Sequence, residues 1–218
     1  MKPTFSNPIL SLALTVLMGA SAPAFAHATH TRAEAAQNIN QVTQTDLVMR
    51  DLWLGHAFWV RMVVVQTLGG NAAAAAVAEN AAVNNAKSLS AALEPFYGKP
   101  ASEKTFTLLA GHYTAVKQYL LATKAKDSAA QDEARKAMFD NAEQIATFLS
   151  TANPHLPIDA LRGMLLAHGG HHVVQIQQLQ NNEYKEEVQT WDAMKDHMYS
   201  IADAMTYALA KQFPARFK

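Results

Sequence analysis

The chain has 218 residues, half of them hydrophobic, and its 18 basic and 18 acidic side chains give a formal net charge of zero. This balance gives no electrostatic reason to expect nucleic acid or an anionic membrane as a partner. The sequence contains no cysteine, which excludes disulfides, thiolate metal ligands and thiol nucleophiles.

Residues 1–26 have the features of a secretory signal peptide. Lys2 precedes an apolar run over residues 8–18, and Ala24-Phe25-Ala26 forms a small-x-small cleavage site. The run is shorter than the roughly 20 apolar residues that a membrane span needs, and no later segment is apolar enough to be one. We therefore expect cleavage near Ala26 and a bacterial protein that is periplasmic or secreted, without a membrane span.

After the signal, the sequence predicts helices almost throughout. Residues 27–44 are small and polar without periodicity, which predicts a flexible leader. Apolar periodicity, capping residues and helix stops then predict six helices, in residues 45–68, 71–96, 102–123, 128–151, 157–179 and 184–213. We expect an all-α fold over residues 45–218, a single domain with a mostly antiparallel four-helix-bundle core and additional helices. The sequence shows no evident internal repeat.

Glycine and proline mark the ends of these helices. Gly69-Gly70 ends the first helix, and Asn153-Pro154 ends the fourth because the residue before a proline disfavours helical dihedral angles. The fifth helix is unusual because it contains three glycines, each costing about 1 kcal/mol relative to alanine. Either the close approach of a neighbouring helix or room for a ligand would offset Gly163, Gly169 and Gly170.

Histidines are the residues that point to chemistry. Five of the nine lie on the apolar stripes of four different predicted helices: His56, His112, His168, His172 and His197. His168 and His172 are four residues apart, so they project from the same side of one helix and can bind one metal ion through a ring nitrogen each. His171 lies about 100° around the helix from His172, and we expect it to be peripheral.

The segment from Leu166 to Leu179 and the earlier His56 resemble the DinB-like superfamily of metal-binding four-helix bundles. In that family a His-x-x-x-His pair precedes a glutamine by three residues, and a third histidine comes from an earlier helix. The resemblance implies that His56, His168 and His172 are metal ligands, with Gln175 at the family's glutamine position. The chain as a whole also resembles, loosely, a group of exported bacterial helical proteins, which implies no mechanism.

Other polar residues are candidates for a supporting role. His112 and His197 face the same interior as the three implied ligands, and we expect them to be additional ligands, to support the ligands or to line the core. Asp203 is expected to enter the interior and orient a histidine, and Gln175 is a further candidate of this kind.

Two functions follow from these residues. The first is a divalent transition-metal protein, with zinc, nickel, copper or iron bound by interior histidines. Three ligands and an open position would permit hydrolase or transferase chemistry on a small-molecule substrate, whereas a closed site would serve storage, sensing or structural support. The alternative is a non-enzymatic binding or scaffold protein with a buried histidine hydrogen-bond network. The sequence indicates neither the oligomeric state nor the substrate.

Overall fold

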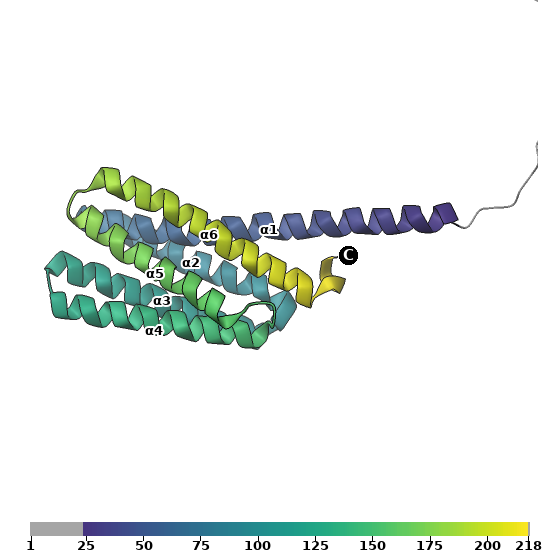
Figure 1. Ribbon diagram of the computed structural model, residues 1–218. Helices are drawn as coiled ribbons and strands as arrows, with labels where there is room; N and C mark the ends of the chain where they lie inside the picture. The colour runs from purple at the N-terminus through teal and green to yellow at the C-terminus, as the bar shows by residue number, and fades with distance from the viewer. Residues whose placement is uncertain (1–23, 218) are drawn as a thin grey trace, which may run out of the picture. The chain divides into compact units, whose positions relative to one another are not determined.

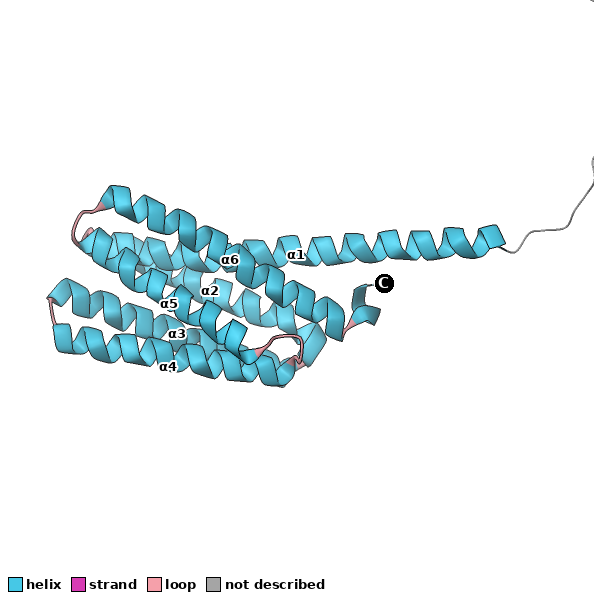
Figure 2. Cartoon of the chain, viewed as in Figure 1, coloured by secondary structure: helices cyan, strands magenta, loops and turns pink. Residues whose placement is uncertain are grey.

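The computed structural model describes the backbone of residues 24–217 and the side chains of residues 39–217; most of the predicted signal peptide lies outside this range. Within residues 24–217 the chain forms six α-helices and one 3-10 turn, without a strand, which confirms the all-α prediction (Figures 1 and 2). The elements are α1 Ala24–Leu68, α2 Ala72–Tyr97, α3 Lys99–Ala125, α4 Ser128–Ala152, α5 Ile158–Gln180, α6 Tyr184–Gln212 and η1 Pro214–Phe217.

Two helices begin earlier than the sequence predicted. α1 starts at Ala24 rather than Thr45, so residues 27–44 are helical although their apolar residues show no periodicity. Alanine, arginine, glutamine and glutamate in this stretch favour a helix by intrinsic propensity alone. α3 starts at Lys99 because Pro100 occupies its first turn, where the missing N–H of proline costs no hydrogen bond. The division into signal, leader and domain remains a prediction.

Residues 37–217 pack as a bundle in which consecutive helices run antiparallel (Figure 1). Each of the helices from α2 to α6 packs against the next, and α3 also packs against α5. α1 is joined to α2 by a hydrogen bond from Asn85 to the carbonyl of Leu52, and to α6 by ion pairs. None of the described helices is both long and apolar enough to cross a membrane.

The bundle consists of three hairpins that repeat at an interval of 56 residues. The second helices of the hairpins, α2, α4 and α6, begin at Ala72, Ser128 and Tyr184. The turn before each of them has one residue with positive φ at the equivalent position: Gly70 at 77°, Lys126 at 58° and Asn182 at 62°. The residue after it caps the helix and donates its backbone N–H to an equivalent carbonyl in each case: Asn71 to Gln66, Asp127 to Ala122 and Glu183 to Gln178.

A side-chain hydrogen bond within each hairpin follows the same interval. In each case a nitrogen on the second helix bonds to a carbonyl on the first: Asn85 to Leu52 at 3.0 Å, Asn141 to Leu108 at 3.1 Å and His197 to Met164 at 2.8 Å. In the first two hairpins the asparagine lies over a glycine, and a Cβ on Gly55 or Gly111 would be 2.9 or 3.0 Å from its amide nitrogen. The fold therefore contains an internal repeat that the sequence analysis missed.

This repeat also positions the histidines. Each of the three carbonyls belongs to the residue one helical turn before a histidine: His56 in α1, His112 in α3 and His168 in α5. The three hairpins thus place one histidine each at an equivalent position.

Candidate metal centre

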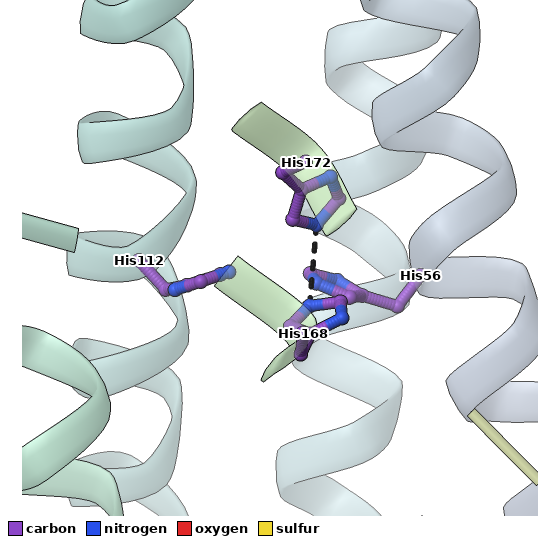
Figure 3. A group of neighbouring side chains, drawn as sticks. All are labelled: His56, His112, His168 and His172. Atoms are coloured by element: carbon purple, nitrogen blue, oxygen red, sulfur yellow. Dashed lines mark hydrogen bonds between the residues drawn. The ribbon is translucent and has the colours of Figure 1, made fainter. Parts of the chain in front are cut away.

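Four histidines meet in the interior of the bundle. His56 comes from α1, His112 from α3, and His168 and His172 from α5, and Figure 3 shows their rings pointing toward a common centre. One ring nitrogen from each residue can be chosen so that all four lie within 4.8 Å of one another. The four side chains are 1–4% exposed, so protein surrounds the group almost completely.

The spacing of the rings fits a single ion. Four imidazoles bound tetrahedrally at a metal–nitrogen distance of about 2.0–2.1 Å would place their nitrogens about 3.3 Å apart and their ring centres about 5 Å apart. The Nε2 atoms of His168 and His172 are 3.2 Å apart, and the six distances between ring centres run from 4.5 to 6.4 Å. The four nitrogens lie within 4.8 Å of one another, so the rings would have to draw closer together to bind one ion at this spacing.

The environment keeps these imidazoles neutral, the form in which they bind metal. Burial lowers the pKa of His56 to about 4. Burial and the neighbouring His56 lower the pKa of His112 to about 3. The pKa values of His168 and His172 lie well below 6.5, because of burial first and the neighbouring histidines second. At neutral pH each ring therefore keeps a lone pair available to an electrophile.

Several ring nitrogens of the four histidines make no hydrogen bond within the described residues. Within the described residues, a single hydrogen bond links two of the four rings, between Nε2 of His168 and Nε2 of His172. Both ring nitrogens of His112 are buried without a hydrogen-bond partner among the residues that the structure describes, and so is the Nδ1 atom of His56. A buried polar atom without a partner costs about 1–3 kcal/mol. A bound cation would take up one lone pair from each ring, which fits the donor set.

The glycines of α5 have different explanations. A Cβ on Gly169, which follows His168, would lie 3.3 Å from the sulfur of Met138 and from a ring carbon of Phe139, so this glycine permits α4 to approach closely. No atom of the described residues lies within 4 Å of a Cβ at Gly163 or Gly170. Close packing therefore explains one of the three glycines, and the structure gives no reason for the other two.

Gln175 bonds to a carboxylate on α6 and is not a member of the group of four histidines. Its amide nitrogen donates to Glu187 at 2.8 Å, and both side chains are buried. Arg61 forms a two-point ion pair with the same carboxylate, with both nitrogen–oxygen distances at 2.6 Å. This pair joins α1 to the start of α6 beside α5, with Glu187 buried and Arg61 partly exposed, and no sequence pattern had indicated it.

Two other candidates lie outside the group. Asp203 was expected in the interior, but its side chain is 46% exposed and pairs with Arg50 at 2.6 Å, so that prediction is wrong. His197 is partly buried, and its ring bonds to the carbonyl of Met164 while lying 5.5 Å from the ring of His171. Both residues lie on α6, and their contacts are with Arg50 and Met164 rather than with the four histidines. His171 is half-buried, as expected of the peripheral member of the adjacent pair.

One groove reaches the group from the surface. It has a volume of about 370 Å³, lies between α2 and α3, and has His56 among its lining residues. Its polar residues include Glu79, Tyr113 and Lys117, with Lys117 paired to Glu79 at 2.6 Å. A second space beside the histidines measures about 10 Å³, no more than one water molecule needs.

The fold and the site together define a helical bundle of three repeated hairpins around a buried group of four histidines. Comparisons with protein-family models, curated proteins and solved structures found no match to this chain.

Proposed function

We propose that this is an exported bacterial protein whose bundle holds one divalent transition-metal ion between His56, His112, His168 and His172. The observation that carries the proposal is the convergence of four buried, neutral imidazoles from three helices. The resemblance to the DinB-like superfamily supports it, since three of these residues are the ligands that the resemblance implies. Residues 1–26 support export by their signal-like pattern.

Zinc is the ion that the donor set favours. Imidazole nitrogens suit zinc, copper, nickel and iron, and zinc prefers four ligands in a tetrahedron. Four histidines would complete that shell, leaving no position for water or a substrate. We therefore propose that the ion supports the structure, is stored or is sensed, and that hydrolase or transferase chemistry would require one histidine to leave it.

A second candidate function is a metal-free scaffold with a buried histidine network. The hydrogen bond between His168 and His172 favours it, because it joins two of the four rings without an ion. Such a network would give acid-sensitive stability that chelators do not change.

Metal content separates the two functions. The protein is refolded from denaturant in chelator-free buffer with equimolar zinc, desalted, and its metal measured by mass spectrometry. We expect one ion per chain, a higher melting temperature than with EDTA, and loss of both in the variant His112→Ala/His168→Ala. His155→Ala removes an exposed histidine and is the matched control. A wild-type protein that retains no ion and melts identically with EDTA would refute the proposal.

A further inference from the structure

The three hairpins differ at one position that matters for the centre. His56, His112 and His168 are equivalent, each 56 residues after the last. One helical turn further along, the first two hairpins have Val60 and Val116, whereas the third has His172. All three of these side chains are 1% exposed, so they occupy equally buried places. His172 therefore has no histidine counterpart in the other two hairpins.

The ring positions show the same distinction. The centres of His56, His112 and His168 form a nearly equilateral triangle with sides of 5.2, 5.7 and 6.1 Å. The ring of His172 is placed unevenly about that triangle, at 4.5 Å from His168, 5.8 Å from His112 and 6.4 Å from His56. It lies next to its own helix neighbour rather than at an equal distance from the three hairpins.

From these two observations we infer that His56, His112 and His168 form the basic metal site, one ligand per hairpin, and that His172 is a fourth ligand that closes it. The inference rests on the proposed function and assigns unequal roles within it. It differs from the ligand set that the family resemblance implies, in which His172 is essential and His112 is not included.

The repeat itself supplies the substitution that tests this assignment. His172→Val gives the third hairpin the residue that the other two already bury at this position, so the helix can carry it. The change removes one possible ligand and leaves the three equivalent histidines intact. His112→Val is the matched substitution in the set of three.

Cobalt(II) is the probe, because its visible absorption reports the number and geometry of its ligands. Each protein is titrated with Co²⁺ alone and in competition with a chelator, which gives the stoichiometry and the affinity. We expect His172→Val to bind one ion, weakened on the order of tenfold or about 1.4 kcal/mol, because one of four ligands is lost. His112→Val should weaken binding at least about tenfold further, a difference of about 1.4 kcal/mol.

The open position left in His172→Val gives a second readout. Added imidazole should bind the Co²⁺ complex of His172→Val and shift its spectrum toward that of the wild type, and it should leave the wild-type spectrum unchanged. Melting in EDTA shows whether each metal-free variant is folded, and a variant that unfolds is replaced by the asparagine substitution at the same position.

The results distinguish this inference from its alternatives. If His172→Val loses most of its affinity for Co²⁺ while His112→Val loses little, the inference is overturned in favour of the ligands that the resemblance implies. Equal losses in both variants would overturn it in favour of four equivalent ligands. A wild-type protein that binds no Co²⁺ would instead refute the proposed metal function itself.

Discussion

Acidification should destabilise the metal-free protein through its buried histidines. In the unfolded chain a histidine takes up a proton near pH 6.5, whereas in the folded chain the pKa of His56 is about 4 and that of His112 about 3. Between these values only the unfolded state binds the proton. Stability is therefore fully present above pH 6.5 and is lost as the pH falls toward the folded pKa values.

The expected loss is large. Each such histidine lowers the free energy of unfolding by roughly 1.4 kcal/mol per pH unit below 6.5, or by about 2 kcal/mol at pH 5. His56 and His112 together therefore cost about 4 kcal/mol, and His168 and His172, whose pKa values are also lowered, increase the loss. Domains have about 5–15 kcal/mol of stability in total. With a slope of about 2 kcal/mol per molar urea, the midpoint should fall by about 2 M between pH 7 and pH 5.

Urea unfolding in EDTA, followed by circular dichroism at half-unit pH steps, measures this effect. His112→Leu removes one titrating group, so the number of protons taken up on unfolding should fall by about one and stability should depend less steeply on pH. His155→Ala, at an exposed position, should leave the dependence unchanged. A wild-type midpoint that does not move between pH 7 and pH 5 would refute the reasoning, as would an unchanged dependence in His112→Leu.

Three further predictions concern packing, the buried ion pair and export. Arg61→Met leaves the carboxylate of Glu187 buried without its cation, so the free energy of unfolding in urea should fall by about 3–5 kcal/mol. The double variant Arg61→Met/Glu187→Leu should regain much of this stability. If the double variant is instead less stable than either single variant by the sum of their losses, the two side chains do not act as a pair. Gly55→Ala should lower the melting temperature, because its Cβ would meet Asn85 at 2.9 Å, whereas Gly163→Ala, with nothing within 4 Å, should stabilise its helix by up to about 1 kcal/mol; the opposite order would show that the contact at Gly55 is unimportant. Protein isolated from the periplasm should begin at His27 by intact mass, and a mass that includes Met1 would contradict export with cleavage.

The helices and the pair His168–His172 could be predicted from the sequence because both depend on local spacing. Glycine turns and Asn153-Pro154 end helices by backbone sterics alone, and two histidines four residues apart share a helix face in any helix. The start of α1 could not be found in this way, since helix propensity acts there without an apolar stripe.

The repeat was harder to find because equivalent positions have different residues. The hydrogen bond from the second helix of each hairpin to a carbonyl of its first helix needs only a suitably placed side-chain nitrogen. Asn85, Asn141 and His197 can therefore all make it. One signal was available: His56 and His168 are equally distant in sequence from His112. That interval could have placed His112 with the ligands.

The buried carboxylate of Glu187 left no such signal in the sequence. It lies in the first turn of α6, where an acidic side chain usually faces solvent and favours the helix dipole. Only the packing of α1 and α5 around that turn brings Arg61 and Gln175 to it.

X-ray absorption spectroscopy of the zinc-loaded protein shows whether the four histidines bind one ion, because it reads the atoms bound to the zinc. We expect one zinc per chain with four nitrogen neighbours at about 2.0–2.1 Å and the outer-shell scattering of imidazole rings. A spectrum with mainly oxygen neighbours, or with fewer than three imidazoles, would contradict it.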